Sequence, residues 1–452
     1  MTRGSRIGTF VCASVVACGD PGRGGEGSVS ADADDTGIDG SGPSMGSADG
    51  SSEVTVDSQG PSTTAVDPDS SEADSGGPKF DVGTNADVGE VSCEACGQAG
   101  SSYIYVANSN VSMMSKINTE TMIEEGRYLT RDGGGGDPSR TSVSIDGQLA
   151  SINNRNIGGV LTVWSSPELC NPNTNGQPGV QTSSGPADVL AWGEDDCVAW
   201  FTEIPGAMRP IAWTAGVYND TTCQYEDQKL WTATSSPVTA YRLDRDTGVI
   251  EDMVAAPQLS FGYGGAADSD GNFWMIDLGV NLVRVNAEDL SVQHWVIPNN
   301  QSVYGITVAS DGRVWMSANM SATTSAVRFT PGDETFDFAT GPVAFAQSGI
   351  VEDAMGRMWM NDWNVPYKIY PIDKESMVTG APFNVPGTNS SAKGIAVDKN
   401  GNVWTAHFDN FAYRMNVDGN VVDSVGGLDY PYTYSDMTGS ALTGVTCGSP
   451  TG

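Results

Sequence analysis

Four acidic or imidazole side chains recur at one position of the sequence, three residues after a Trp. They are Glu203, Asp277, Asp362 and His407. Carboxylate oxygens and imidazole nitrogens bind divalent cations such as Mg²⁺ or Ca²⁺, and a His that titrates near neutral pH can act as a general base. If the four positions are equivalent, their side chains face one rim of a common channel. We therefore expect a metal or cationic-ligand site there, with Glu203 and His407 as the catalytic candidates.

The segments that must position these residues form a repeat. The stretch from Gly394 reads GIAVDKNGNVWTAHFDNFAYRMN, and related stretches begin at Gly264, Gly305 and Gly349. Their Trp residues are at 274, 315, 359 and 404, so the intervals are 41, 44 and 45 residues. Such intervals are typical of a propeller blade of four strands.

The turn inside each repeat resembles the start of a calcium loop. Asp268, Asp270 and Asn272 have the spacing of such a loop, but the distal Glu ligand is missing and the pattern recurs from repeat to repeat. Asp-Gly and Asn-Gly pairs favour two-residue hairpins because both residues tolerate positive φ. We therefore expect a hairpin turn, with the following Trp in the core.

The repeat predicts an all-β fold, a β-propeller with seven four-stranded blades, and eight as the alternative. The count depends on the stretch from Leu149 to Trp231, which spans 82 residues, nearly two periods. An additional blade built around Trp200 and Trp213 fits this length, and insertions would also account for it.

The two ends of the repeat region complement each other. The stretch after Ser101 matches the second to fourth strands of a blade, and the stretch after Tyr432 resembles a lone first strand. A C-terminal strand that completes the first blade would close the ring and remove the exposed sheet edges.

The charge of the chain limits its partners. It contains 22 Lys and Arg against 56 Asp and Glu, a net charge of −34, so a polyanion would be repelled. We expect no nucleic acid partner, and a monomer.

The N-terminus has the features of an export signal. Basic residues precede an apolar run over 7–17, which is too short to span a bilayer. The run ends in Val-Val-Ala before Cys18, which resembles a bacterial lipobox, with a plain secretory signal as the alternative. We therefore expect a lipoprotein signal peptide over 1–17, a disordered acidic linker rich in Asp, Ser and Gly over 18–98, and the propeller over 99–452.

The remaining cysteines predict disulfides, since an exported chain meets an oxidising compartment. The six candidates allow fifteen pairings. Two of them form a Cys-x-x-Cys pair, whose alternative is a metal or redox site. The candidates are Cys93, Cys96, Cys170, Cys197, Cys223 and Cys447.

The pattern Gly-x-x-x-Asp-x-x-Gly-x-x-Trp resembles that of the streptogramin (virginiamycin B) lyase-like and NHL-like propellers. The resemblance implies a site at the mouth of the central channel, with a His before the repeat Gly, and Glu or His three residues after the Trp, around Mg²⁺. Glu203 and His407 match the second position, but the residues before the repeat Gly are Gly264 (before Gly265), Tyr304, Ser348 and Lys393.

We therefore expect a propeller that acts as a binding or interaction module for a protein or carbohydrate ligand. Its expected location is the cell envelope, as an outer-membrane or surface lipoprotein held in the membrane through Cys18, with a secreted protein as the alternative. The alternative function is that of a metal-dependent lyase-like enzyme.

Overall fold

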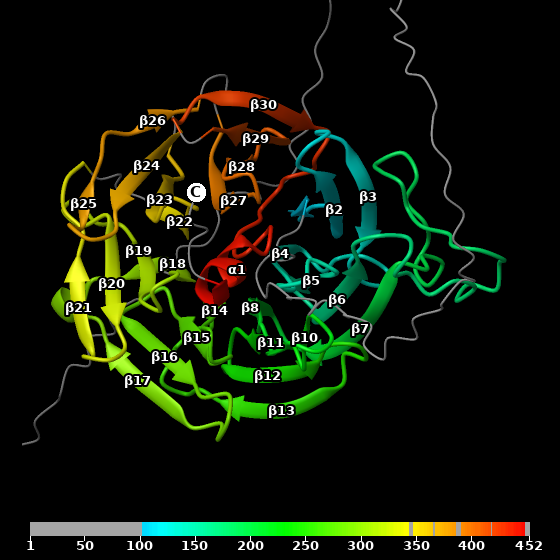
Figure 1. Cartoon of the computed structure of the whole chain (residues 1–452), viewed down its shortest axis with the longest axis horizontal. Coiled ribbons are helices and arrows are strands. Elements are labelled where there is room, and N and C mark those ends of the chain that lie inside the picture. Colours follow the sequence, from blue (N-terminus) through cyan, green and yellow to red (C-terminus); the bar gives the residue numbers. More distant parts are fainter. Residues whose placement is uncertain (1–101, 343–346, 365–366, 386–389, 417, 448–452) are drawn as a thin grey trace, which may run out of the picture. The chain divides into compact units, whose positions relative to one another are not determined.

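The computed structural model describes residues 102–342, 347–364, 367–385, 390–416 and 418–447. Seven antiparallel sheets surround a central axis (Figure 1), which confirms the seven-bladed prediction. The innermost strands of neighbouring sheets contact one another around this axis. The predicted signal peptide, Cys18, the acidic linker, Cys93 and Cys96 lie outside the described residues. Within the described ranges, no helix has both the length and the apolar character needed to cross a membrane.

The blades follow one another along the chain, and each runs from the axis outward. The first blade has β1 (Tyr103–Asn108), β2 (Met113–Asn118) and β3 (Glu124–Leu129), and the second has β4 (Pro138–Val143), β5 (Leu149–Asn154), β6 (Gly158–Trp164) and β7 (Val198–Pro205). The third has β8 (Met208–Trp213), β11 (Lys229–Thr234), β12 (Thr239–Asp244) and β13 (Ile250–Ala255), and the fourth has β14 (Gly264–Ala267), β15 (Phe273–Ile276), β16 (Asn281–Val285) and β17 (Val292–Val296).

The last three blades follow the same plan. The fifth has β18 (Val303–Val308), β19 (Val314–Ala318), β20 (Ala326–Thr330) and β21 (Thr335–Phe338). The sixth has β22 (Gln347–Glu352), β23 (Arg357–Asp362), β24 (Lys368–Asp373), β25 (Val378–Thr379) and β26 (Phe383–Asn384), and the seventh has β27 (Ala392–Val397), β28 (Val403–His407), β29 (Phe411–Met415) and β30 (Val421–Gly426). A short 3-10 turn, η1 (Pro298–Asn300), precedes the fifth blade.

The repeat Trp and the repeat Asp form one structural unit. In three blades the indole N–H donates to the Asp carboxylate six residues earlier, at 2.8 Å: Trp274 to Asp268, Trp359 to Asp353 and Trp404 to Asp398. The same carboxylate also accepts backbone N–H groups of the turn, as Asp268 does from Asp270 at 3.1 Å and from Asn272 at 2.9 Å. The expected hairpin turn is confirmed, and each Trp is buried. The expected two-residue loop is wrong, because Ala267 pairs with Phe273, and Gly271, but not Asp270, has a positive φ.

The fifth blade lacks this acceptor, which gives a first prediction. Ala309 occupies the Asp position, and the buried Nε1 of Trp315 has no hydrogen-bond partner among the described residues. Ala309→Asp is expected to raise the free energy of unfolding by about 1 kcal/mol, because a buried donor gains its acceptor. Chemical unfolding measures the change, and the gain should vanish in a Trp315→Phe background. An equal gain in that background would contradict the pairing.

The C-terminal segment closes the ring in the innermost position of the first blade. Tyr105 on β1 donates its N–H to the carbonyl of Met437 at 3.0 Å, and the N–H of Tyr434 donates to Ser139 on β4 at 3.2 Å. A single parallel bridge pairs Arg140 with Tyr434. The segment then continues as a helix, α1 (Ser440–Cys447), in the part of the sequence where the strand was expected to continue.

Helix α1 lies in the middle of the ring (Figure 1) and contacts β18, β22 and β27. It begins here because the carboxylate of Asp436 accepts the N–H groups of Ala441 at 3.2 Å and Leu442 at 3.1 Å. Gly439, at φ +82°, makes the turn that leads into the helix. Leu442 lines an apolar pocket with the far ends of the inner strands, so α1 fills that end of the channel.

The burial of Asp436 gives a second prediction, since it raises the pKa of the carboxyl to about 6. The pKa of this carboxyl in the unfolded chain is about 4, lower than in the folded protein. The group therefore stabilises the fold fully below about pH 4, and this stabilisation is lost as the pH rises through about 6. Asp436→Asn removes the titrating group but keeps only one of the two oxygens that accept helix N–H groups. The stability of this variant relative to wild type is expected to rise between pH 4 and pH 7, by on the order of 2 kcal/mol. Thermal unfolding across this pH range checks it, with the exposed Asp270→Asn as control. A gain that does not depend on pH would contradict it.

Two insertions account for the additional length between Leu149 and Trp231. The first joins β6 to β7, and the second contains a hairpin of β9 (Val217–Asn219) and β10 (Gln224–Glu226). Trp200 therefore lies on the outer strand of the second blade, and Trp213 on the inner strand of the third. The additional blade around these two residues, which the eight-blade alternative required, is not formed.

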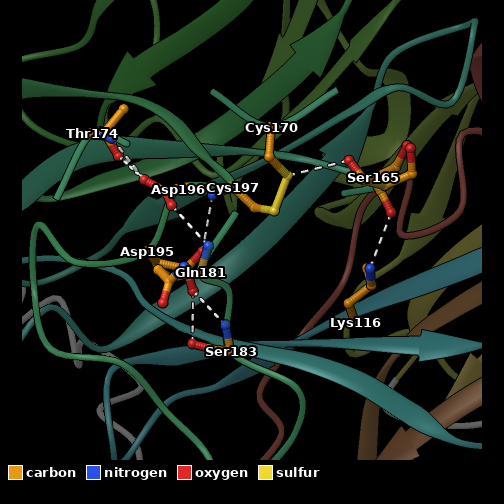
Figure 2. The surroundings of a disulfide bond; sticks show 10 residues. Lys116, Ser165, Cys170, Thr174, Gln181, Ser183, Asp195, Asp196 and Cys197 are labelled. Atoms are coloured by element: carbon orange, nitrogen blue, oxygen red, sulfur yellow. Dashed lines mark hydrogen bonds between the residues drawn. A yellow bond between two sulfur atoms is a disulfide. The ribbon is translucent and has the colours of Figure 1, made fainter. Parts of the chain in front are cut away.

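A disulfide between Cys170 and Cys197 links the two ends of the first insertion (Figure 2). Inside the loop, the Asp196 carboxylate accepts the N–H of Gln181 at 2.8 Å, and the Asp195 carboxylate accepts the N–H of Ser183 at 2.9 Å. The predicted use of cysteines in disulfides is thus confirmed for this pair, and Cys223 and Cys447 are also disulfide-bonded.

Candidate functional site

The four residues predicted to share a site lie at the same end of the propeller, outside the innermost strands. Asp277 follows β15, while Asp362 and His407 end β23 and β28, the second strands of their blades. Glu203 lies on β7, the outermost strand of its blade, because the first insertion shifts the repeat there. In the described part of the chain, no three His, Cys, Asp or Glu side chains lie close enough to hold a metal ion. The described structure therefore does not bring three of the four predicted donors together around one point.

Each predicted carboxylate has a local partner. Asp277 accepts hydrogen bonds from the N–H of Gly279 at 2.8 Å and from Asn281 Nδ2 at 2.6 Å, so it caps its own turn. Asp362 accepts the N–H of Asn364 at 3.1 Å, and burial raises the pKa of its carboxyl to about 6. Glu203 has a largely exposed side chain that faces Arg131 across 3.6 Å.

His407 lies in a closed environment. It is fully buried, its Nδ1 is 3.2 Å from the carbonyl of Ser390, and its Nε2 is 2.9 Å from the hydroxyl of Thr405. The rings of Tyr367 and Tyr413 pack edge-on at 4.2 and 4.8 Å. Burial lowers the pKa of His407 to about 4, so the imidazole is neutral at neutral pH. These contacts are those of a core histidine.

A second group of polar and aromatic residues lies on the innermost strands, at the ends where these strands begin. In the third to seventh blades, the residue concerned lies three positions before the residue that pairs with the repeat Trp. The residues at this position are Arg209, Tyr263, Tyr304, Ser348 and Lys393.

Arg140 on β4 and two tyrosines of the C-terminal segment complete the group. We call the seven charged and aromatic residues the mouth cluster: Arg140, Arg209, Tyr263, Tyr304, Lys393, Tyr432 and Tyr434.

The tyrosine hydroxyls of the mouth cluster form a network centred on Tyr432. Its oxygen lies 3.2 Å from that of Tyr304 and 3.3 Å from those of Tyr263 and Tyr434. Tyr434 donates to Tyr263 at 2.9 Å, and Arg209 Nη1 donates to Tyr434 at 3.0 Å. Four phenols that are each at most 8 % exposed thus share one polar centre.

The cations of the cluster lie against aromatic rings. The Arg140 guanidinium is 3.7 Å from the ring centroid of Tyr434, and Arg209 is 4.9 Å from that of Tyr263. The Lys393 ammonium is 3.2 Å from the ring centroid of Trp363, beside the cluster. No carboxylate of the described residues forms an ion pair with Arg140 or Arg209. The mouth is therefore cationic in a chain whose net charge is −34.

This charge acts on the phenol of Tyr432. Burial alone would raise its pKa, but the positive charge of Arg209 and the hydrogen bonds from Tyr263, Tyr304 and Tyr434 outweigh burial and lower the pKa to about 8. Burial raises the pKa values of Tyr263 and Tyr304 well above 10. Neighbouring titratable groups whose pKa values are shifted in opposite directions are typical of functional sites.

Sequence reasoning missed this cluster for identifiable reasons. The position before the repeat Gly does define Tyr304 and Lys393, but only a His was sought there. In the third blade Pro210 replaces the Gly after Arg209, and Tyr432 and Tyr434 come from the opposite end of the chain. An alignment of inner strands by their pairing with the Trp strand would have identified Arg209 and Tyr263.

No family model and no curated protein matches the chain. Solved structures do share its fold. A functionally unknown protein from Desulfotomaculum acetoxidans is 14 % identical, with a TM-score of 0.54 over 73 % of this chain and 97 % of that one. The virginiamycin B lyase from Staphylococcus aureus is 16 % identical, with a TM-score of 0.50 over 68 % of this chain and 92 % of that one. A streptogramin B lyase is 15 % identical, with a TM-score of 0.51 over 67 % and 88 %.

At identities of 14 to 16 %, these similarities show a shared fold and not a shared function, because one fold supports many functions. The fold of this chain is that of the streptogramin lyase-like β-propellers.

Proposed function

We propose that this chain is a ligand-binding propeller of the cell envelope, and that it binds a small anion at the mouth cluster. The observation that carries the proposal is the pair of guanidinium groups, Arg140 and Arg209, without a carboxylate partner in the described structure. A buried cation without a counter-charge is costly for folding. Aromatic rings offset part of that cost, and a bound anion would offset more of it.

The surroundings fit a small polar group. A pocket of about 10 Å³ lies at the mouth, lined by Arg140, Tyr304, Ser348, Lys393 and Tyr434. A volume of this size holds about one water molecule. The group that enters the pocket is therefore small, such as one end of a ligand.

A thermal-unfolding screen tests the proposal. The full chain is mixed with acetate, benzoate, sulfate and inorganic phosphate, and with neutral and cationic compounds of similar size, at constant ionic strength. At least one anion should raise the melting temperature by mass action, and Arg209→Met should abolish that shift. Arg284→Met, on β16 away from the mouth, is the matched control. Equal shifts from neutral compounds, or full retention in Arg209→Met, would contradict the proposal.

The envelope location is part of the same proposal. The Cys170–Cys197 disulfide supports an oxidising compartment, and the lipobox-like stretch before Cys18 supports a lipid anchor. Metabolic labelling with palmitate should mark the wild-type protein but not Cys18→Ser. Labelling of both would refute the anchor at Cys18.

An enzyme that uses acid–base chemistry is the second candidate. The observation that favours it is the Tyr432 phenol with a pKa of about 8, in contact with three other hydroxyls. Such a phenol can accept a proton near neutral pH. If Tyr432 has this role, Tyr432→Phe should keep anion binding while abolishing turnover. If Tyr432 is only a binding contact, the substitution should weaken binding.

A further inference from the structure

Two other arginines show how this chain holds carboxylates. Arg127 donates through Nε and Nη2 to the two oxygens of Glu124, at 2.6 and 2.7 Å. Arg155 donates through the same two nitrogens to Asp137, at 2.6 and 2.8 Å. In both pairs one edge of the planar guanidinium meets one planar carboxylate, the bidentate geometry that arginine favours.

Arg140 presents the same edge without an acceptor. Its Nη1 donates to the hydroxyl of Ser435 at 3.1 Å, whereas Nε and Nη2 have no hydrogen-bond partner among the described residues. The residue is only 1 % exposed, so water does not solvate this edge freely. One bidentate acceptor would satisfy both buried donors of this edge together.

The surroundings of Arg140 fix the edge in place. Tyr434 stacks on the guanidinium at 3.7 Å, and Tyr263 contacts it at 4.9 Å. Arg140 and Lys393, which is 5 % exposed, line the same pocket. A carboxylate on the Arg140 edge would thus meet a second positive charge in that pocket.

We propose that the ligand of the mouth cluster is a small carboxylic acid whose carboxylate binds the Nε and Nη2 edge of Arg140. This inference rests on the proposed function and specifies its ligand class. A planar carboxylate occupies the same edge in Arg127 and Arg155, and this is the geometry that we assign to the ligand of Arg140. The neighbouring rings favour an acid with an apolar or aromatic body.

Ligand-side comparison with the full wild-type chain tests the geometry without any substitution. Calorimetric titration with benzoate is compared with benzenesulfonate, a tetrahedral anion, with benzamide, a neutral analogue, and with inorganic phosphate. Benzoate should bind at least about tenfold more tightly than each of the others, because only benzoate offers a planar, charged, two-oxygen acceptor. Acetate, which lacks the ring, should bind more weakly than benzoate and more tightly than phosphate.

Protein-side comparison locates the site. Arg140→Lys keeps the charge but loses the two-donor edge, and should weaken benzoate binding by about tenfold or more. Arg284→Lys is the matched control and should leave it unchanged. If Arg140→Lys does not fold, the ligand series on the wild-type chain decides alone.

The outcomes separate this inference from the proposed function. Benzenesulfonate or phosphate bound as tightly as benzoate, with binding lost in Arg209→Met, would overturn the carboxylate inference and leave an anion-binding mouth. Unchanged benzoate binding in Arg140→Lys would likewise overturn it. If no anion binds, both proposals fail.

Discussion

Truncation of Trp404 to Ala is expected to lower the free energy of unfolding by about 3–5 kcal/mol, the largest single effect we predict. Trp404 is fully buried, and its indole N–H donates to Asp398 at 2.8 Å. It packs in a cluster with Ile104 of the first blade and Met437 of the closing segment. Its loss therefore leaves a cavity where the ring closes and removes one of the hydrogen bonds that the Asp398 carboxylate accepts.

Chemical unfolding of the wild type, Trp404→Ala and Trp295→Ala measures this effect. Trp295 lies on the outer strand β17 and is partly exposed, so its truncation should cost less. A loss below about 1 kcal/mol for Trp404→Ala would show that the closure does not depend on this side chain.

Acidification is expected to destabilise the fold through His407, the second large effect. Because burial lowers the pKa of His407 to about 4, the folded state favours the neutral imidazole. The contribution is complete above the unfolded pKa of about 6.5 and is lost as the pH falls through about 4. With about 1.4 kcal/mol for each pH unit, the full loss is on the order of 3 kcal/mol.

The comparison of His407→Gln with wild type across pH 7 to 4 isolates this term. Gln cannot titrate, so the substitution should remove the part of the acid sensitivity that His407 causes. His294→Gln, at an exposed position on β17, is the control and should follow the wild type. Asp436 and Asp362 have raised pKa values, so acidification stabilises the fold through these two groups. The effect of His407 is therefore measured as the difference between the variant and the wild type, and the wild-type curve alone does not show it. An unchanged pH dependence in His407→Gln would contradict the burial argument.

The fold could be predicted because its signals are local. The Trp and the Asp six residues before it bond to each other within one hairpin, so the same short sequence recurs wherever that hairpin forms. The period was misleading only at Trp200, where a disulfide-bonded insertion precedes the outer strand and places a Trp-led stretch in a different structural position. Even there, the seven-blade prediction was correct.

The candidate site could not be predicted in the same way, because it depends on contacts between distant residues. Arg140 and Tyr434 are nearly three hundred residues apart and meet only when the C-terminal segment closes the ring. His407 was prominent in the sequence because it varies within a repeated position, yet its strand faces the core. The strand on which a polar residue lies within its blade determines whether the residue reaches the channel. The sequence did not show whether a given polar residue would reach the channel from the first strand or the second strand.

Spectrophotometric titration of the tyrosines tests the central claim, a cationic mouth, most directly. Wild-type protein should show one phenol ionising near pH 8, and this step should be absent in Tyr432→Phe. Arg209→Met should move the step to higher pH, because it removes the positive charge that favours the phenolate. If every tyrosine of the folded wild type ionises at about pH 10 or above, the positive charge at the mouth does not outweigh the burial of Tyr432, which contradicts this account of the site.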